Sequence, residues 1–416
     1  MASITVQPGI RKGTVQVPPS KSDAQRALLC AAFSQGTSIL HHVGRSADEL
    51  SMIQAIASLG AQVIEREKGE FSVMGIESLP NRISIDAHES GLGARLLTAV
   101  CSTGKGTVTV KGSGSLKSRT MHFFEDVLPH FGAKITDFNG HLPITVQGPL
   151  LGRDLDVDGS VSSQFISGLL MALPLADGNS RLTVADLASG PYVRMTLNTL
   201  AAFGIQIETE EMHRFSIAGG QHYQATEYTI EGDWSAASCW LTAAALGADI
   251  SVKGLNPSSV QADKQMLAAL MSAGCSVHVT SDGIRVNGTT KHPFEFDASD
   301  CPDLFPSLVT LAALIPGKSI IHGANRLIHK ESNRALSLIS EFLTLGITIE
   351  FLDNALHIHG KSTIRGGEVH AHNDHRIAMS LGICGLFSQE AILIQGSESV
   401  RKSYPTFWEE MDALAH

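Results

Sequence analysis

The chain has 416 residues, of which 43% are hydrophobic and 17% are charged. This composition is typical of a globular protein with two to three domains, and it excludes an intrinsically disordered chain. The 31 Lys and Arg residues against 41 Asp and Glu give a net charge of −10, which disfavours a protein that coats nucleic acid.

Cysteine usage and hydropathy indicate a cytoplasmic protein. The six cysteines are scattered through apolar segments without a C-x-x-C pair, which predicts buried thiols in a reducing compartment. The N-terminal sequence MASITVQPGI lacks the basic and apolar regions of a secretory signal. No apolar run approaches the ~20 residues that a membrane helix needs, so we expect no membrane partner.

A helical pattern that ends in glycine and leads into a β-like run recurs along the chain, from QAIASLG-AQVIE to SEFLTLG-ITIEF. Glycine readily adopts the left-handed conformation that ends a helix. A polar turn and another alternating run usually follow, which predicts a β-hairpin. The glycines, at spacings of 72, 72, 70 and 72 residues, are Gly60, Gly132, Gly204, Gly274 and Gly346.

A second pattern recurs with a similar period, in which a short strand leads into a polar loop and then an apolar helix. The copies, counted at one strand position, are at Val17, Ile85, Val157, Ile230, Phe296 and Val369. Together the two patterns predict six βαβαββ units. The last unit ends at a helix near 407–415, whereas the N-terminus carries spare β-like sequence in ITVQP and GTVQVP.

We therefore predict that the two ends of the chain belong together, in an α/β (α+β) fold of two domains with three repeat units each. The first lobe is expected to comprise residues 1–18 plus 233–416, and the second lobe residues 19–232. An open solenoid is the alternative, but it normally needs polar caps, which the sequence lacks. An active site is expected in the cleft between the lobes.

Basic residues recur in the loops that open the predicted helices. A helix N-terminus favours anions through its free N–H groups, and Lys and Arg strengthen that preference. Each residue alone could be a solvated surface charge, but their repeated placement favours a site for anionic ligands. The residues are Lys21, Arg26, Arg119, Lys330, Arg334, Arg376 and Lys402.

Other polar residues near these loops have two open interpretations. The run Ser162-Ser163-Gln164 could surround a phosphate, or it could simply cap a helix. Asp303 and Glu331 lie near the cations in the sequence and could act as a base and an acid, or as helix caps and ion-pair partners.

The sequence does not favour a metal or a nucleotide cofactor. Five histidines (His357, His359, His370, His372 and His375) could suggest a metal site, but no H-E-x-x-H or Cys/His zinc pattern is present. We expect these histidines to be hydrogen-bonded or to face solvent. The phosphate loop G-x-x-x-x-G-K-[ST], the dinucleotide turn G-x-G-x-x-G and the nucleophile elbow G-x-S-x-G are also missing.

Several motifs, in order along nearly the whole chain, resemble those of the 5-enolpyruvylshikimate-3-phosphate synthase (3-phosphoshikimate 1-carboxyvinyltransferase) family. They are SKSDAQRALL at 20–29, LKSR at 116–119, GSVSSQF at 159–165, KESNR at 330–334, NDHRIAM at 373–379 and RKSYPTFW at 401–408. The resemblance implies the enolpyruvyl transferase fold, an inside-out α/β barrel in each of two domains. It also implies an enzyme without metal or cofactor.

The resemblance implies that the enolpyruvyl group of phosphoenolpyruvate moves to the 5-hydroxyl of shikimate 3-phosphate and that phosphate leaves, through a tetrahedral intermediate. This is a step of aromatic amino-acid biosynthesis. The residues implied to bind phosphoenolpyruvate are Lys21, Gly91, Arg119, Gln164, Arg334, Arg376 and Lys402. Those implied to bind shikimate 3-phosphate are Lys21, Ser22, Arg26, Ser162, Ser163, Gln164, Ser189, Tyr192, Asp303 and Lys330.

The resemblance also implies the proton-transfer groups: Asp303 as the base for the 5-hydroxyl, and Glu331, with Lys21, as the acid at the methylene carbon. The chain departs from the family motifs at a few positions. Glu89 and Leu92 replace residues of the glycine loop that contains Gly91, which bears on phosphoenolpyruvate and glyphosate affinity. Arg326 stands where the family usually has Asn, and Gly190 where it often has a basic residue.

Three alternatives remain beside this interpretation. The enolpyruvyl transferase that acts on UDP-N-acetylglucosamine usually has Lys-Asn where this chain has Lys21-Ser22, and a Cys in the loop that here reads KGSGSLKSR. RNA 3′-terminal phosphate cyclase shares the folding unit, but the acidic composition disfavours it. A non-catalytic repeat scaffold would not need Asp303 and Glu331 among the cations. We expect small-molecule substrates, no nucleic acid, and a monomer.

Overall fold

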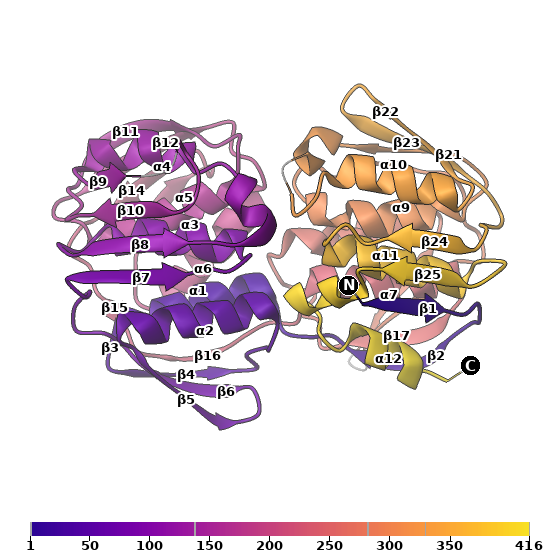
Figure 1. Ribbon diagram of the computed structural model, residues 1–416, viewed down its shortest axis with the longest axis horizontal. Helices are drawn as coiled ribbons and strands as arrows, with labels where there is room; N and C mark the ends of the chain where they lie inside the picture. The colour runs from indigo at the N-terminus through magenta and orange to yellow at the C-terminus, as the bar shows by residue number, and fades with distance from the viewer. Residues whose placement is uncertain (1, 137–138, 281–282, 329, 416) are drawn as a thin grey trace. The chain divides into compact units, whose positions relative to one another are not determined.

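A computed structural model describes residues 2–136, 139–280, 283–328 and 330–415. The chain is divided into two compact units (Figure 1). Unit 1 consists of Met1–Pro18 and Glu231–His416, and unit 2 consists of Pro19–Ile230. Unit 2 is thus one continuous segment, whereas unit 1 joins the first residues of the chain to its second half.

In unit 2, each four-stranded sheet combines a parallel strand pair with an antiparallel hairpin. In spatial order the sheets are β16 (Glu227–Thr229), β4 (Thr37–His41), β6 (Glu70–Met74) and β5 (Gln62–Glu67); β7 (Arg82–Asp86), β8 (Thr107–Lys111), β10 (Ile144–Gln147) and β9 (Lys134–Thr136); and β11 (Asp154–Asp158), β12 (Ser180–Ala185), β14 (Arg214–Ile217) and β13 (Ile207–Glu210). A short parallel pair joins β3 (Ser34–Gln35) to β15 (Tyr223–Gln224).

Unit 1 repeats this arrangement, and its last sheet takes a strand from the N-terminus. The sheets are β2 (Lys12–Gln16), β17 (Asp249–Lys253), β19 (Gly283–Asn287) and β18 (Ser276–Thr280); β20 (Glu295–Asp297), β21 (Gly317–His322), β23 (Ala355–Gly360) and β22 (Thr348–Leu352); and β24 (Gly367–His370), β25 (Ile392–Gln395) and β1 (Ser3–Val6).

The helices of each unit form its interior. Among the described residues, six helices are buried over almost their whole length: α1 (Lys21–Ala32), α3 (Gly91–Cys101), α5 (Ser163–Ala172), α7 (Trp234–Leu246), α9 (Phe305–Ala313) and α11 (His375–Leu386). A helix that is apolar around its circumference, such as α9, belongs in a core. Helix α1 also buries the polar side chains of Asp23, Gln25 and Arg26. The others keep exposed residues: α2 (Ala47–Leu59), α4 (His122–Val127), α6 (Gly190–Ala202), α8 (Met266–Ser272), α10 (Arg334–Thr344) and α12 (Phe407–Ala413).

The predicted α/β fold class is confirmed. Strands alternate between core-facing and exposed residues, as in β8 and β10, so each sheet covers the helices with one face. None of the sheets formed by the described residues closes into a barrel of strands. Helices inside and sheets outside are the arrangement that the family resemblance implied.

The N-terminal strands are built into unit 1. Strand β1 pairs with β25 in antiparallel register, from Ser3 opposite Gln395 to Val6 opposite Ile392, and Figure 1 shows the two side by side. Strand β2 runs parallel to β17, and the Lys12 N–H donates to the carbonyl of Ala415 at 2.9 Å. The strand before α1 therefore lies in a unit 1 sheet. The strand before α7, β16, pairs with β4 in unit 2.

The predicted helix ends are confirmed at the repeat glycines, and the polar loops of the second pattern supply helix caps. All five repeat glycines have positive φ, from 81° at Gly204 to 112° at Gly60, so each can end a helix. Helices α1, α3, α5, α7 and α11 begin after a Ser or Asp whose side chain accepts a backbone N–H of the first turn.

One predicted helix is shorter than its apolar pattern suggested. Helix α4 ends at Val127, and a 3₁₀ turn over Leu128–Phe131 continues the segment EDVLPHFG. Pro129 causes the change because it has no N–H for an α-helical hydrogen bond. The predicted burial of the cysteines is confirmed for all six. No helix among the described residues has both the length and the apolar character to cross a membrane.

We predict that the contact between β1 and α11 limits what Gly385 can be. A Cβ at Gly385 would lie 2.7 Å from Cβ of Val6. Gly385→Ala should lower the free energy of unfolding by about 1–2 kcal/mol, because overpacking outweighs the gain in helix propensity. Urea unfolding monitored by circular dichroism measures the change. A Cβ at Gly385 would also lie 2.7 Å from Cγ1 of Val6, so Val6→Ala in the same chain, which removes Cγ1, should restore part of the loss. A Gly385→Ala protein as stable as the wild type would contradict this packing.

Candidate active site

Arg334 is the centre of a polar cluster in unit 1. It is the first residue of α10, and its side chain is 1% exposed. Its Nε donates to Asp374 at 2.7 Å, Nη1 to Asp303 at 2.7 Å and Nη2 to Glu331 at 2.5 Å. Burial lowers the pKa of Arg334, but these three carboxylates outweigh burial and keep the pKa well above its usual value.

Asp303 is held by three cations. It lies in the 3₁₀ turn η5 (Pro302–Leu304), ahead of α9. Lys330 donates to Oδ1 at 3.2 Å, Arg334 to Oδ1 at 2.7 Å, and Arg376 to Oδ2 at 3.0 Å. Burial raises the pKa of Asp303, but the attraction of these cations prevails and holds the pKa well below its usual value. The surrounding cations therefore favour the ionised form of Asp303.

Lys330 and Glu331 are two partly exposed members of this ion-pair network. The Lys330 side chain is partly exposed, and burial lowers its pKa while Asp303 opposes the shift. Glu331 bonds to Arg334 within one turn of chain, and its side chain also remains partly open to solvent. The side chains of Lys330 and Glu331 can therefore contact a ligand without a change in the backbone of the cluster.

Arg376 and Lys402 complete the predicted cations of unit 1. Arg376 is the second residue of α11, and its backbone N–H donates to the cap residue Asp374 at 3.0 Å. Burial lowers the Arg376 pKa, but Asp303 raises it and the net shift is upward. Lys402 ends the 3₁₀ helix η7 (Ser397–Lys402) and donates to the carbonyl of Asn373 at 2.8 Å.

The sequence prediction missed Asp374, which links two elements of the cluster. This fully buried residue caps α11 and also accepts Nε and Nη2 of Arg334, at 2.7 and 3.2 Å. An Asp before an apolar helix is a recognisable cap signal. Its pairing with an arginine 40 residues earlier leaves no local trace in the sequence.

In unit 2, the predicted cation Lys21 is the first residue of α1. Its Nζ lies 2.9 Å from Oδ2 of Asp48, on α2, and both side chains are largely buried. The N-cap of α1, Ser20, accepts the backbone N–H of Asp23. Asp48 was not predicted as a partner, because it reads as an ordinary acidic residue in the first turn of a helix.

Gly91 brings the backbone of α3 close to two guanidinium groups. A Cβ at this position would lie 2.5 Å from Nη1 of Arg119 and 3.2 Å from Nη1 of Arg95. Ser90 caps the helix by accepting the N–H of Gly93 at 3.1 Å. The absence of a side chain at Gly91 therefore leaves the space that Arg119 occupies beside the helix start, as a site for an anion requires.

Gln164, in the first turn of α5, is oriented by Arg95. The guanidinium of Arg95 donates to Oε1 of Gln164 at 2.5 Å and lies over the ring of Phe165, 4.7 Å from its centroid. Because Oε1 faces Arg95, the amide NH₂ of Gln164 points to the other side and can donate to an anion. Ser162 caps α5 through the N–H of Gln164 at 3.3 Å, and Ser163 is buried beside it.

Arg26 lies inside the helices of unit 2, with 1% of its surface exposed. Its guanidinium donates to the hydroxyls of Thr196 and Ser167, at 2.8 and 3.4 Å, and to the carbonyls of Ser22 and Tyr192, at 2.6 and 3.3 Å. Burial lowers its pKa to about 10. Arg26 therefore ties α1 to α5 and α6, a role that sequence analysis did not predict.

Ser189 and Tyr192 lie at the start of α6. Ser189 is in the left-handed region with φ 53°, which is unfavourable for a residue other than Gly. Its place before Gly190 and Pro191 fixes a sharp entry to the helix. The carbonyl of Tyr192 accepts Arg26, so this turn is tied directly to α1.

The departures from the family motifs have different surroundings. The carboxylate of Glu89 lies against Gly114, where a Cβ would be 2.6 Å from Oε1, at the start of the 3₁₀ turn η1 (Gly114–Ser118) that Arg119 follows. Leu92 is buried in the core of unit 2. Burial lowers the pKa of Arg326, in the turn η6 (Ala324–Leu327), while Asp300 and Asp303 oppose the shift.

The histidine group is spread over separate polar contacts. His359 lies 3.0 Å from a Glu350 oxygen, and His372 lies 2.7 Å from Oε1 of Glu341. Over the described residues, no group of three or more His, Cys, Asp and Glu side chains is arranged to hold a metal ion.

The sequence model of one family, EPSP synthase (3-phosphoshikimate 1-carboxyvinyltransferase), matches residues 7–411. The chain belongs to this family. Among relatives of the EPSP synthase family, the 3-phosphoshikimate 1-carboxyvinyltransferase of Clostridium acetobutylicum is 37% identical, over 100% of this chain and 97% of its own length. That of Clostridium novyi is 34% identical, over 100% of this chain and 98% of its own.

A solved structure of EPSP synthase from Acinetobacter baumannii has a TM-score of 0.81 and 26% sequence identity to this chain, and the match covers 99% of this chain and 98% of the other. The family resemblance that the motifs indicated is thereby confirmed. The agreement in fold also extends over the segments outside those motifs.

We predict that Thr196 stabilises unit 2 through Arg26. Thr196→Val keeps the shape of the side chain but removes the acceptor of Arg26 Nε, so a buried donor loses its partner. The free energy of unfolding should fall by about 1–3 kcal/mol, the usual cost of such a loss. Urea denaturation measures the change.

The matched control is Thr199→Val in the same helix. Thr199 is also buried, but within the described part of the chain its hydroxyl donates only to the carbonyl of Met195, one turn earlier, at 3.0 Å. Its replacement should change stability much less. Equal losses for the two variants would contradict a special role for the Arg26 contact.

Proposed function

We propose how the residues described above carry out the reaction of the EPSP synthase family. That reaction transfers the carboxyvinyl group of phosphoenolpyruvate to the 5-hydroxyl of shikimate 3-phosphate and releases phosphate. It is a step of the shikimate pathway, which leads to aromatic amino acids. Membership of the family carries the assignment of the reaction, because the match covers residues 7–411.

The substrates bring at least four ionisable acid groups together, two phosphates and two carboxylates. Two unit charges 4 Å apart repel by about 1 kcal/mol in water and by roughly 4 kcal/mol where the effective dielectric constant is near 20. Cations must therefore compensate the substrates where they meet. The carboxylate of phosphoenolpyruvate would bind Arg334 and Arg376, since a guanidinium matches a carboxylate with two parallel hydrogen bonds.

The remaining substrate contacts are assigned to cationic residues and to hydrogen-bond donors. Lys21, Arg119, Gln164 and Lys402 would bind the phosphate of phosphoenolpyruvate, with the α3 backbone at Gly91 alongside. The geometry supports Gln164 as a donor. Its Oε1 accepts a hydrogen bond from Arg95, so its amide NH₂ points away from that guanidinium. Shikimate 3-phosphate would bind Lys21, Ser22, Arg26, Ser162, Ser163, Gln164, Ser189, Tyr192, Asp303 and Lys330.

Asp303 would accept the proton of the 5-hydroxyl. Held by three cations, it is a weak base, because its pKa lies well below the usual value. When the substrate carboxylate takes hydrogen bonds from Arg334 and Arg376, Asp303 shares these cations with another anion and its basicity rises. Binding of phosphoenolpyruvate would thus prepare the base for the other substrate.

Glu331 would protonate the methylene carbon, with Lys21 assisting. Its link to Arg334 at 2.5 Å favours the ionised form. Glu331 can therefore carry a proton more easily once Arg334 has turned to the substrate. The move of Arg334 from its carboxylate partners to the substrate would thus prepare both Asp303 as the base and Glu331 as the acid.

We further propose that the two units correspond to the two lobes predicted from the repeats, and that both contribute residues to one substrate site. Each unit carries part of the predicted set: Lys21, Arg26 and Arg119 in unit 2, and Asp303, Arg334 and the other residues in unit 1. We also propose that the protein is a cytoplasmic monomer that needs neither metal nor cofactor.

The decisive experiment measures phosphate release from phosphoenolpyruvate in the presence and absence of shikimate 3-phosphate. Release should require both substrates. Lys21→Ala should lower kcat/KM by about 100-fold or more, the usual cost of removing a group that stabilises developing charge. A well-folded wild type that releases no phosphate would leave a non-catalytic scaffold as the better interpretation.

Two variants control for indirect effects of Lys21→Ala. Asp48→Asn removes the charge that pairs with Lys21 but keeps the lysine, so activity should fall only a few-fold. Lys318→Ala removes an exposed lysine on β21 and should leave activity unchanged. If Asp48→Asn reduced activity as strongly as Lys21→Ala, the effect would come from the ion pair and not from contact with substrate.

A further inference from the structure

Asp263 is a buried carboxyl group next to the unit 1 cluster. It lies in the 3₁₀ turn η4 (Ala262–Gln265) and is 0% exposed. The hydroxyl of Ser235, on α7, donates to its Oδ2. The turn is fixed to the same helix by Gln261, whose Oε1 accepts the N–H of Trp234 at 3.1 Å. The position of Asp263 is therefore well defined.

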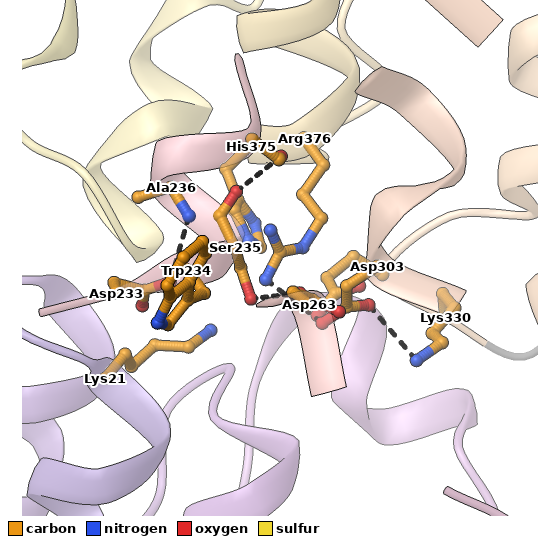
Figure 2. A network of polar contacts seen from close by, with 12 residues as sticks. Lys21, Asp233, Trp234, Ser235, Ala236, Asp263, Asp303, Lys330, His375 and Arg376 are labelled. Atoms are coloured by element: carbon orange, nitrogen blue, oxygen red, sulfur yellow. Dashed lines mark hydrogen bonds and ion pairs between the residues drawn. The ribbon is translucent and has the colours of Figure 1, made fainter. Parts of the chain in front are cut away.

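The carboxyl group of Asp263 lies near both Asp303 and Arg376, as Figure 2 shows. Burial raises the pKa of Asp263 to about 6, Asp303 adds to the rise, and Arg376 opposes it. At pH 8 the group is therefore mostly ionised. A buried carboxylate in such a place needs an explanation, because burying a charge is unfavourable unless it is paired.

Two atoms of this group of residues are complementary. Oδ1 of Asp263 and Nε of Arg376 are both buried, and neither has a hydrogen-bond partner among the described residues. One is an acceptor without a donor, and the other is a donor without an acceptor. Buried polar groups are paired in most proteins, so each of these atoms indicates a second arrangement in which it is satisfied.

We propose that Asp263 is a positioning residue for Arg376, whose Nε–H it accepts at Oδ1 when the guanidinium turns from Asp303 towards the carboxylate of phosphoenolpyruvate. This inference rests on the proposed function of Arg376 as a substrate-binding residue. It goes beyond that function because it assigns Asp263 and Ser235, which do not contact the substrate, a role in substrate affinity.

The role follows from what Arg376 loses when it turns. Its side chain is 8% exposed, and Nη2 donates to Asp303 at 3.0 Å. Asp303 must share its cations with the substrate carboxylate during the reaction. Asp263 then supplies a fixed carboxylate on the other side of the guanidinium, so that Arg376 keeps a protein partner while its Nη groups face the substrate.

The experiment compares steady-state kinetics of Asp263→Asn and Ser235→Ala with those of the wild type at pH 8. Asp263→Asn removes the charge of the acceptor and should raise KM for phosphoenolpyruvate about 10-fold. KM for shikimate 3-phosphate should change less than about 2-fold, because the Arg376 carboxylate contact belongs to the other substrate. Ser235→Ala, which loosens Asp263, should raise KM for phosphoenolpyruvate about 3-fold.

Glu341→Gln is the matched control for neutralising a buried carboxylate in unit 1. Glu341 is buried, accepts the backbone N–H of His370 at 2.8 Å and lies 2.7 Å from Nε2 of His372, neither of which belongs to the cluster. It should lower stability without changing either KM. If Asp263→Asn does not fold, Ser235→Ala tests the same contact.

A second measurement follows the ionisation of Asp263 without using activity. Its pKa of about 6 lies above the unfolded value of about 3.9, so the folded protein holds an extra proton between these pH values. Stability due to Asp263 is therefore complete below about pH 4 and falls as pH rises to about 6. The groups that face it are Asp303 and Cys301 from the η5 segment, Arg376 from α11, and Asp233 at the start of α7.

The wild type should accordingly lose stability relative to Asp263→Asn as pH rises from about 4 to 6, measured as the difference between their urea midpoints. Parallel curves would show that folding does not raise the pKa of Asp263, so that its carboxyl is not buried beside Asp303, and would overturn the inference. If the wild type is active and KM for phosphoenolpyruvate is unchanged in both variants, the role of Asp263 is overturned but the proposed function stands. A wild type that releases no phosphate would overturn the proposed function itself.

Discussion

A protein that binds two highly charged anions must keep its cations folded and partly buried before either anion arrives. Unit 1 meets this constraint with carboxylates: Arg334 donates to Asp303, Glu331 and Asp374. Unit 2 uses a carboxylate for Lys21 but neutral oxygens for Arg26. Since an unpaired buried charge is strongly destabilising, these partners are part of the fold as well as of the site.

Pairing a cation with a carboxylate and pairing it with neutral oxygens have different consequences for the chemistry of the site. A cation held by a carboxylate can exchange one anion for another with little change in net charge. The carboxylate left behind then becomes a better base, which is the change that the role proposed for Asp303 requires. A cation held by neutral oxygens, such as Arg26, has no competing anion to displace. It therefore fixes the helices of unit 2 and offers a constant positive charge.

Much of this architecture can be predicted from the sequence because its signals are local. Glycines with positive φ end the helices, and Ser or Asp residues begin them, at the positions that the repeats indicated. The partners of the site residues could not be predicted in this way. Asp374 bonds to an arginine 40 residues away, and Thr196 bonds to one 170 residues away. Such pairs depend on how the helices pack.

The motifs nevertheless indicated the family that the sequence model then matched over residues 7–411, because each motif is a short run of neighbouring residues that can be recognised without knowing the fold. The motifs did not indicate which other residues hold the proposed site residues in place. Asp263 lies in a short turn between a strand and a helix, and Arg95 lies within an apolar helix. Only the surroundings of these side chains show that Asp263 lies near Arg376 and that Arg95 orients Gln164.

The placement of β1 and β2 in unit 1 has a consequence for the order in which the protein folds during translation. Unit 2 is complete once residue 230 has left the ribosome, and domains generally fold as units. The first 18 residues are made before it but have to wait for β17 and β25. Residues 1–18 are thus synthesised ahead of unit 2 but reach their native neighbours after it has folded.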